Sequence, residues 1–587
     1  MGRRAESPAR LILPRAMSSE SSSRRRSPKH HSALAQAMRS IAFVGAGPTT
    51  LYALKALLEA PLPDARITVF ESGPEAGVGS PYRPGWNDPA MLSNIASAEI
   101  PPVTQTLLEW LQERSSSELE AMGVAPETLN DRTFVSRVAL GQFFGDQFRR
   151  LVERARAAGT TIDVCTGCQV VDVVNQAHGV ALSWVGETPR SRTAIFDHVV
   201  LATGHQWPWR QEASPGYFTS PWPAATLTEL PPTAIGIRGS SLTAIDAAIA
   251  LARSHGAFVP RPQGFDYESA PGTEALHITL MSRKGLLPEA DFYFPLPHPP
   301  LEICTPAAIR QLIRDGADGL LDRAFDLFRA ELQTVDPDYV AATGLTDAGL
   351  EAFGEAAFET RASTDPFVWA AANLGEARAN HAAKITVPWR DALLRMHEVI
   401  ATIAPHLNDT DFDRFTRHWK PVFVDAYGAV PHDSIERLLA LHRAGKLEVL
   451  ALGDSYTLET RPKEEGARLI VGGAVRQFPV FIEATGQKAL GAIQFPFLSL
   501  IEQGVVRDAA SDQSDGLIRG IEVNDHFALV ADGLPANRLF CVSLPFILGR
   551  KPFAQGITSS HDMGGTVGRC LARVVASAPV DTPRAVA

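Results

Sequence analysis

Cysteine is scarce in this chain, and long uncharged apolar stretches are absent. The 587 residues contain five cysteines, an odd number spread along the chain. This usage argues against a disulfide framework and suits a reducing compartment, so we expect a cytoplasmic protein. No run of about eighteen uncharged apolar residues occurs, so the sequence predicts no membrane-spanning helix. The N-terminus also lacks the hydrophobic segment of a secretory signal.

Only two of the cysteines, Cys165 and Cys168, are closely spaced. Disulfide reductases use such a C-x-x-C pair beside a flavin, and structural zinc sites use two such pairs. The chain has no second pair, so the sequence predicts no metal site. Because the pair stands in an expected strand and turn, we interpret these residues as ordinary buried cysteines.

Charge is unevenly distributed along the chain. The net charge is −10, yet residues 1–40 contain nine Arg or Lys against two Glu, which makes them +7 and the remainder −17. Residues 1–37 are rich in Ser, Arg and Pro without apolar periodicity, so they are expected to form a disordered basic extension. A transit peptide, a nucleic-acid tail and a dispensable upstream extension before Met38 are all compatible. The acidic body argues against nucleic acid as the main partner.

The remaining composition is that of a soluble globular protein. Apolar residues make up 45% of the chain and charged residues 20%, which are ordinary proportions. The length is sufficient for two or three domains with large cores.

The clearest motif is a dinucleotide-binding turn, "IAFVGAGPTT" at residues 41–50. Gly45 allows the tight turn, and Gly47 lets a pyrophosphate approach the backbone at a helix N-terminus. Thr50 stands where Gly or Ala is usual, so we expect slightly looser packing of helix on strand. The next strand pattern ends in Glu71, whose carboxylate is placed to accept a ribose hydroxyl.

A second turn of the same kind, "IGIRGSSLTAID", occupies residues 235–246. Gly239 takes the first glycine position, Ser240 follows it, Ser241 takes the second position and Ala244 the third. Serine at the second position crowds the pyrophosphate, although its hydroxyl can donate to a phosphate. The turn therefore either holds a nicotinamide cofactor or is a degenerate copy that no longer binds one.

The strand pattern after this second turn ends in a basic pair rather than an acid. Ser282, Arg283 and Lys284 stand where the first unit has Glu71. A 2′-phosphate is repelled by an acid and held by cations with a hydroxyl, so the pattern favours NADPH over NADH. A solvated strand end is the other interpretation.

Three further segments resemble the two-dinucleotide flavoproteins of the glutathione-reductase-like family. Two strands end in Ala-Thr-Gly, in "FDHVVLATGH" and "FPVFIEATGQ", and the segment 537–568 combines a strand, a Gly-rich loop and a helix start. In that family these strands mark crossings between the two domains, and the last segment covers the flavin. The resemblance implies that FAD and NADPH are the cofactors and adds four cofactor-binding candidates: Thr203, Gly204, Gln555 and Gly556.

The resemblance predicts an α/β fold with two Rossmann-like dinucleotide-binding domains and a helical insertion. After the extension at 1–37, we expect the FAD-binding domain in two parts, 38–230 and 478–587, and the NADPH-binding domain at 231–477. The helical insertion is expected at 295–420, because apolar residues recur there at helical spacing. It is expected to shape a substrate pocket, to close the site or to form a dimer face.

Several polar residues outside the turns are candidates for contact with the flavin or the substrate. Asn94, in the Gly/Pro-rich loop 77–102, is expected to line the flavin. His205 and His561 are candidate proton donors that could equally be caps or packing residues. If the substrate carries carboxylates, the candidate partners by residue type are Arg390, Arg417 and His418. No catalytic residue is identified by the sequence.

The combination "GAGPTTLYAL", "SPYRPGWNDPAMLSNIAS", "ATGH", "GIRGSSLTAID" and "MSRKGLLPEADFYFPLP" resembles the FAD/NAD(P)-binding proteins that include the nitrosuccinate-forming aspartate N-monooxygenases. That resemblance implies that NADPH reduces FAD, that oxygen adds at flavin C4a, and that the hydroperoxide oxidises the nitrogen of a small amine or amino acid. The expected partners are therefore an aspartate-like amine and O2. A flavin reductase or oxidase and a non-catalytic flavoprotein scaffold stay open as alternatives.

Overall fold

The computed structural model describes residues 38–59, 62, 65–188, 190–207, 210–460, 464–509 and 517–576. The predicted basic extension at 1–37 lies outside the described residues. None of the described helices is both long enough and apolar enough to pass through a bilayer.

The first sheet is a five-stranded parallel sheet with the strand order β19-β7-β1-β2-β3. Its strands are β1 (Arg39–Val44), β2 (Ala65–Phe70), β3 (Thr161–Cys165), β7 (His198–Leu201) and β19 (Leu539–Cys541). The middle strands are mainly apolar and mostly buried, as is usual for parallel strands covered by helices. The last strand comes from nearly 500 residues beyond the first, so this unit is assembled from two distant parts of the chain.

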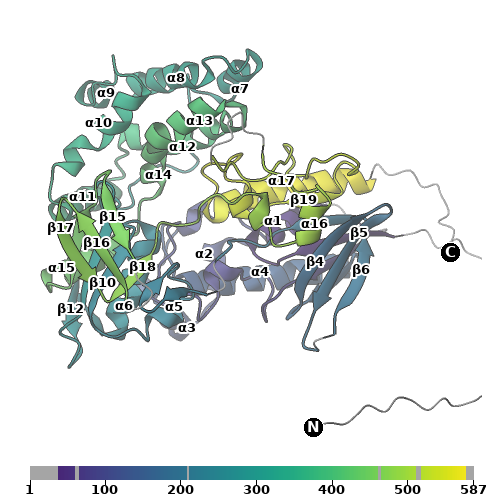
Figure 1. Cartoon of the computed structure of the whole chain (residues 1–587), viewed down its shortest axis with the longest axis horizontal. Coiled ribbons are helices and arrows are strands. Elements are labelled where there is room, and N and C mark those ends of the chain that lie inside the picture. Colours follow the sequence, from purple (N-terminus) through teal and green to yellow (C-terminus); the bar gives the residue numbers. More distant parts are fainter. Residues whose placement is uncertain are drawn as a thin grey trace, which may run out of the picture. The chain divides into compact units, whose positions relative to one another are not determined.

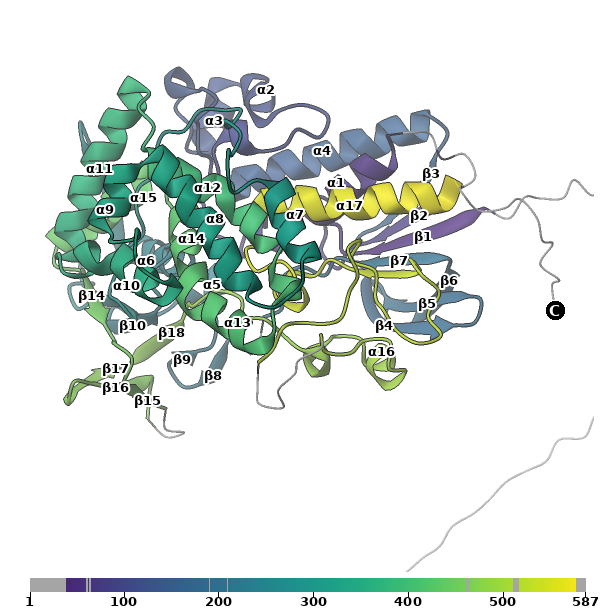
Figure 2. The same cartoon turned by 90° about the horizontal axis from the view of Figure 1, so that it is seen from above.

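Helices cover both the turn and the core of this first unit. They are α1 (Pro48–Leu57), α2 (Leu107–Gln112), α3 (Ser116–Ala121), α4 (Arg137–Ala157), α16 (Leu498–Glu502) and α17 (Gly556–Ala576). Helix α17 lies along α1 (Figures 1 and 2). A Cβ at Gly568 would lie 2.3 Å from the Ala53 carbonyl oxygen, so glycine is required for this close approach.

The second sheet contains six strands in the order β14-β13-β10-β18-β9-β8, all parallel except the terminal β8–β9 pair. Its strands are β8 (Glu212–Ser214), β9 (Tyr217–Phe218), β10 (Ala234–Arg238), β13 (His277–Ser282), β14 (Leu447–Ala451) and β18 (Val480–Glu483). Helices α5 (Ala224–Leu227) and α6 (Leu242–Ser254) belong to the same unit, and α6 follows β10 directly.

The helical middle region extends further than its predicted range, 295–420. It contains α7 (Pro306–Arg314), α8 (Leu320–Val335), α9 (Pro337–Ala342), α10 (Leu350–Ala362), α11 (Pro366–Ala383), α12 (Pro388–Ala401), α13 (Asp409–Arg414), α14 (Lys420–Tyr427) and α15 (His432–Arg443). Most of these helices share a separate core that includes Phe328, Met396, Trp419 and Phe423. By contrast, α11 and α15 pack against the second sheet, so these two helices belong to that unit.

Three small antiparallel sheets are inserted in the two units. They are β4 (Gln169–Gln176), β5 (Gly179–Val185) and β6 (Arg192–Phe196); β11 (Gly256–Arg261) and β12 (Gly264–Ser269); and β15 (Tyr456–Glu459), β16 (Ala467–Val471) and β17 (Ala474–Phe478). In Figure 1 the first of these hairpin sheets stands beside the first unit, and the last stands beside the second unit.

The predicted fold class is confirmed, because two parallel sheets each present a strand–turn–helix unit and a helical region interrupts the second. Two predicted boundaries differ from the structure. Strand β18 pairs with β10 in the second sheet, so the return to the first unit occurs after Glu483 and not at residue 478. Strands β8 and β9 also join the second sheet, although residues 212–218 lie before the predicted boundary at 230. Both differences follow from long-range strand pairing, because β18 lies between β10 and β9 in the second sheet.

Candidate active site

A cavity of about 1200 Å³ lies between the loops of the two dinucleotide units and the middle helices. Its wall includes parts of the segment 80–99, the start of α6, residues 485–487 after β18, and the start of α17. Helices α12 and α14 close the remaining side. Ligand pockets usually measure about 300–1,000 Å³, so this cavity has room for a cofactor ring and a small substrate together.

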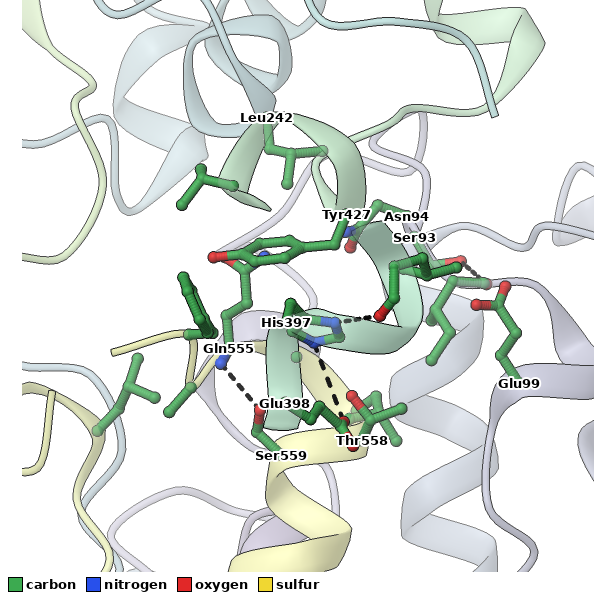
Figure 3. Close-up of a pocket in the computed structure, with 18 of the residues that line it drawn as sticks. Ser93, Asn94, Glu99, Leu242, His397, Glu398, Tyr427, Gln555, Thr558 and Ser559 are labelled. Atoms are coloured by element: carbon green, nitrogen blue, oxygen red, sulfur yellow. Dashed lines mark hydrogen bonds and ion pairs between the residues drawn. The ribbon is translucent and has the colours of Figure 1, made fainter. Parts of the chain in front are cut away.

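Figure 3 shows the side chains that three regions of the fold direct toward this cavity. The labelled residues are Ser93, Asn94 and Glu99 from the first unit, Leu242 from α6, His397, Glu398 and Tyr427 from the middle helices, and Gln555, Thr558 and Ser559 from the start of α17.

The first dinucleotide turn has the shape that a pyrophosphate needs. Gly45 has a φ of 98°, and a Cβ there would lie 2.2 Å from the Ala202 carbonyl oxygen, so only glycine fits. Gly47 is the N-cap of α1, and a Cβ added to it would lie 3.4 Å from the Gly79 Cα. The helix N-terminus is therefore left uncrowded, and Ser80, the residue after Gly79, already lines the cavity. This cradle fits FAD.

The two remaining residues of the first motif are buried and hydrogen-bonded. Thr50 is fully buried, and its hydroxyl donates to the Gly45 carbonyl oxygen at 2.6 Å, so the larger third residue ties the turn to the helix. Glu71 accepts from the N–H groups of Ala46 (3.0 Å) and Gly73 (2.7 Å) and pairs with Arg83 (3.0 Å). Oε1 also receives a long contact from the Ser72 hydroxyl at 3.5 Å, whereas Oε2 accepts only from Ala46, so Oε2 is the oxygen with room for a ribose hydroxyl.

The second turn is also built on a glycine that no other residue can replace. Gly239 has a φ of 140°, and a Cβ there would lie 2.3 Å from the Ala484 carbonyl oxygen. Ser240 is buried and donates to the Leu286 carbonyl oxygen at 2.6 Å. Ser241 is exposed at the N-terminus of α6, and its side chain makes no capping hydrogen bond. Its hydroxyl is thus directed at no group of the helix and is accessible to a phosphate.

At the basic strand end beside this turn, one of the two cations already forms a close ion pair. Ser282 lies 2.9 Å from the Ser240 hydroxyl. Lys284 pairs closely with Glu355, whereas Arg283 is about half exposed and makes only long contacts with Glu355 (3.9 Å) and Asp454 (3.6 Å). Arg283 is therefore the cation of this pair that is accessible to a 2′-phosphate.

The remaining cofactor-binding candidates divide between the cavity wall and the strand ends. Asn94, Gln555 and Gly556 line the cavity. Thr203 follows β7 and instead joins the two halves of the first unit, because its hydroxyl lies 2.8 Å from that of Ser543. Gly204 follows with a φ of 70°.

The two candidate histidines have different surroundings. His205 lines the cavity and stacks on Trp207 with ring centroids 5.7 Å apart. Burial lowers the pKa of His205 to about 4, so the ring is neutral at physiological pH and is a poor proton donor. His561 lies further along α17, beside Asp562 and the ring of Tyr52, and is not part of the cavity wall.

The three cationic candidates for a substrate carboxylate lie outside the cavity wall. Arg390 is buried against Glu289 at 3.0 Å, so its charge is already neutralised. Arg417 is exposed and pairs with Asp413 on its own helical segment. His418 is not among the lining residues either. Residue type alone does not indicate where these side chains point.

The paired cysteines are free thiols at the end of β3. Cys165 and Cys168 are half-buried rather than fully buried, and neither lines the cavity. Backbone hydrogen bonds join this turn to the strand end that carries Glu71, since the Cys168 N–H donates to the Glu71 carbonyl oxygen at 2.8 Å.

Glu99 is a cavity residue that sequence reasoning missed. It ends the short helix Ser97–Glu99, and its Oε1 accepts from the Ala96 N–H at 2.9 Å. Burial, reinforced by the charge of Asp291, raises the pKa of Glu99 to about 7. Its position within the loop already identified as functional was an available signal, but its burial was not visible in the sequence.

Lys420 is the second missed residue, at the start of α14. It lines the cavity, is partly buried, and has no ion-paired or hydrogen-bonded partner within the ranges that the structure describes. Burial lowers the pKa of its ammonium group. A π-helical turn, Phe415–Trp419, immediately precedes it and sets its direction. Such turns occur frequently at functional sites.

Comparison with known proteins supplies two family assignments within the chain. A family model described as FAD-NAD(P)-binding matches residues 42–206, which confirms the predicted cofactor class of the first unit. A model described as the YdhS-like middle domain matches residues 305–427. The chain is also 41% identical over 537 residues to "Uncharacterized protein YdhS" of Escherichia coli (strain K12), covering 91% of this chain and 98% of that protein.

Among solved structures, the chain is similar to several flavoproteins at low identity. Ornithine hydroxylase (PvdA) from Pseudomonas aeruginosa has a TM-score of 0.45 and 12% identity, covering 91% of this chain and 99% of that one. The FAD-bound cadaverine monooxygenase DfoA from Erwinia amylovora has a TM-score of 0.44 and 13% identity, covering 94% and 97%.

Proposed function

This chain belongs to the YdhS family, and from that premise we propose that it is an FAD- and NADPH-dependent monooxygenase that hydroxylates the nitrogen of a small amino acid. The observation that carries the proposal is a pair of opposite charges in the cavity. Glu99 and Lys420 both line it, and neither has an ion-pair partner among the described residues. An amino acid offers the complementary pair, an ammonium and a carboxylate.

Glu99 is suited to act as the base of this reaction. An ammonium nitrogen has no free electron pair, so an amine must lose a proton before it can be oxidised. With its pKa raised to about 7, Glu99 is ionised above neutrality and is still basic enough to take that proton. Its Oε1 is engaged by the Ala96 N–H, so Oε2 is the atom that would receive it.

Lys420 is suited to hold the carboxylate of the same substrate. The other cations in the cavity wall are already neutralised, since Arg137 lies 2.8 Å from Asp246 and Arg395 lies 2.8 Å from Asp391. A buried cation is costly without a counter-charge, and a substrate carboxylate supplies one. An amino acid is therefore the substrate class to test, with L-aspartate among the first, and Lys420 takes the place of the earlier candidates Arg390, Arg417 and His418.

The two dinucleotide turns are suited to hold the cofactors around this pair of charges. The first turn and Glu71 would bind FAD, with Asn94 and Gln555 beside its ring, and Ser241 with Arg283 would bind NADPH. When bound, FAD supplies the activation of oxygen and NADPH supplies the electrons.

Apolar side chains around the reacting nitrogen would exclude water from the site. Leu242, Leu544 and Phe553 line the cavity together with the ring of Tyr427. An apolar lining that excludes water favours the neutral amine and protects reactive species from hydrolysis.

The test is flavin absorbance after rapid mixing with NADPH in the absence of oxygen, followed by air with and without L-aspartate and other amino acids. We expect the flavin to bleach, and NADPH use in air to be matched by N-oxygenated product when the right amino acid is present. Bleaching with NADPH converted entirely to hydrogen peroxide under every amine tested would contradict monooxygenation. No bleaching would contradict the assignment of the second turn.

A further inference from the structure

Three side chains from separate elements converge beside the second sheet, outside the cavity wall described above. Asp291 lies in the loop after β13, His381 is in the last turn of α11, and His432 is the first residue of α15. One potential metal-ligating atom from each lies within 4.8 Å of the other two.

The backbone holds these three positions in place. The Asp291 N–H donates to the Val430 carbonyl oxygen at 2.8 Å, which joins the loop to the chain just before α15. His432 Nε2 lies 2.8 Å from the Asp291 carbonyl oxygen, and this contact orients the imidazole ring. Backbone carbonyls commonly orient ligating histidines in this way.

The distance between Asp291 and His381 is close to that expected between two ligand atoms of one tetrahedral metal ion. Asp291 Oδ2 lies 3.1 Å from His381 Nε2, yet Nε2 has no partner with hydrogen-bond geometry among the described residues. Bonds of about 2.0–2.1 Å to one tetrahedral ion place two ligand atoms about 3.3 Å apart. The two atoms are therefore close without pointing at each other, as atoms directed at a common centre would be.

The two imidazole rings have a matching arrangement. The rings of His381 and His432 are perpendicular, and their centroids lie 5.1 Å apart. With metal–nitrogen bonds of about 2.0 Å and a ring radius of about 1.2 Å, two imidazoles on a tetrahedral ion have centroids about 5.2 Å apart. The observed separation is close to that value.

We propose that Asp291, His381 and His432 form a binding site for a divalent cation of the zinc class. Two imidazoles and a carboxylate form a nitrogen and oxygen donor set typical of such ions. This proposal replaces the expectation of no metal, which considered only the cysteines.

The bound ion would link the loop at Asp291 to α11 and α15, the two helices of the middle region that pack against the second sheet. It would therefore stabilise the packing of this loop and these two helices within the second unit. A simple Asp–His ion pair is the competing interpretation, and it predicts no bound metal. The site does not depend on the proposed monooxygenase activity.

The experiment is isothermal titration of the full-length, untagged, chelator-treated protein with zinc chloride, with zinc content measured by elemental analysis. Both use a background carrying H30A and H31A, because these adjacent histidines can bind zinc by themselves. We expect one zinc per chain and a rise in Tm of about 5 °C at saturating zinc. His381→Ala and Asp291→Asn should abolish both effects, whereas His178→Ala, at an exposed turn between β4 and β5, should abolish neither.

Cobalt(II) provides a second measurement that does not depend on the stability of any variant. Bound at this site, it should show the visible absorption bands of a tetrahedral cobalt ion, and zinc should displace them. Absence of stoichiometric zinc in the parent protein overturns the proposal. Retention of zinc by folded His381→Ala or Asp291→Asn protein, judged by far-UV circular dichroism, overturns it equally.

Discussion

At the scale of single residues, the most informative feature is a carboxyl group whose environment raises its pKa. The buried side chain of Glu99 feels the negative charge of Asp291, and both effects favour the protonated form. A group of this kind changes charge near neutral pH, where a surface glutamate is always ionised. Its effect on function is therefore visible in a pH profile.

We predict that the wild-type rate of amino-acid oxidation rises with pH through about 7, because Glu99 must be ionised to accept a proton. Glu99→Gln should lower kcat/KM by about a hundredfold or more and remove that ionisation from the profile. The measurement is steady-state NADPH oxidation between pH 5.5 and 9.

The matched control for this change is Glu120→Gln at an exposed helical position. Since folding disfavours the charged form of Glu99, the Glu99→Gln protein should keep its Tm at pH 8. An unchanged pH profile in Glu99→Gln would refute the assignment of this base.

Lys420 gives a second prediction at the same scale. Lys420→Met should raise the KM for an amino acid by about ten- to hundredfold, because a charge-assisted contact with the carboxylate is lost. The KM for the corresponding decarboxylated amine should not change. Steady-state kinetics with the matched pair of substrates measures the difference, and Lys384→Met at an exposed position is the control. Equal effects on both substrates would show that Lys420 does not contact a carboxylate.

At the scale of elements, the two strand–turn–helix units differ in the strand end that follows each turn. β2 is followed by the buried Glu71, whereas β13 ends in Ser282, followed by the half-exposed Arg283. In the proposed function, this difference lets the first unit bind a ribose hydroxyl and the second bind a 2′-phosphate.

Arg283→Ala should therefore weaken NADPH binding by about tenfold and leave NADH binding unchanged. Initial rates of flavin reduction at varied NADPH and NADH report the two apparent dissociation constants. Arg417→Ala, an exposed arginine paired on its own helix, is the control. If both nucleotides weaken alike, Arg283 does not recognise the 2′-phosphate.

The packing of α17 on α1 gives another prediction at the scale of elements. Gly568→Ala would place a methyl group 2.3 Å from the Ala53 carbonyl oxygen, so the two helices would have to separate. We expect a loss of about 1–3 kcal/mol in the free energy of unfolding and weaker FAD retention.

The matched control for this helix contact is Gly375→Ala on α11, where no atom lies within 4 Å of the added Cβ. There the change should stabilise the protein slightly, because alanine favours the helix. Denaturant unfolding and the flavin content of the purified proteins measure both effects. Equal stability of the two variants would contradict the close α1–α17 contact.

At the scale of the whole molecule, three apolar cores correspond to the two dinucleotide units and the middle helices. The cavity lies where these parts meet, so its wall combines residues from each of them. The family model of the middle region, residues 305–427, includes both Lys420 and Tyr427.

Because residues 1–37 lack apolar periodicity, their deletion should leave the flavin content and the Tm unchanged. The comparison is made between full-length and shortened proteins purified in parallel, with flavin quantified by absorbance. A loss of FAD from the shortened protein would show that the basic extension contributes to the cofactor site.

The sequence by itself determined the two dinucleotide turns and hence the fold class. Their geometry is local: Gly45 and Gly239 require positive φ angles, and apolar strands flank each of them within a few residues. The identity of the strand ends, Glu71 and Arg283, was likewise readable from position alone. Such features need no knowledge of distant parts of the chain.

Only the tertiary structure decided which charged side chains share a space. Glu99 and Lys420 are separated by more than 300 residues, and they share a space because the segment 80–99 and α14 both border the same cavity. Arg390 was selected from the sequence by residue type, but it forms a buried ion pair with Glu289. Asp291, His381 and His432 likewise converge without a sequence spacing that signals a metal. Burial and long-range contact determine these properties, and neither is encoded in a local pattern.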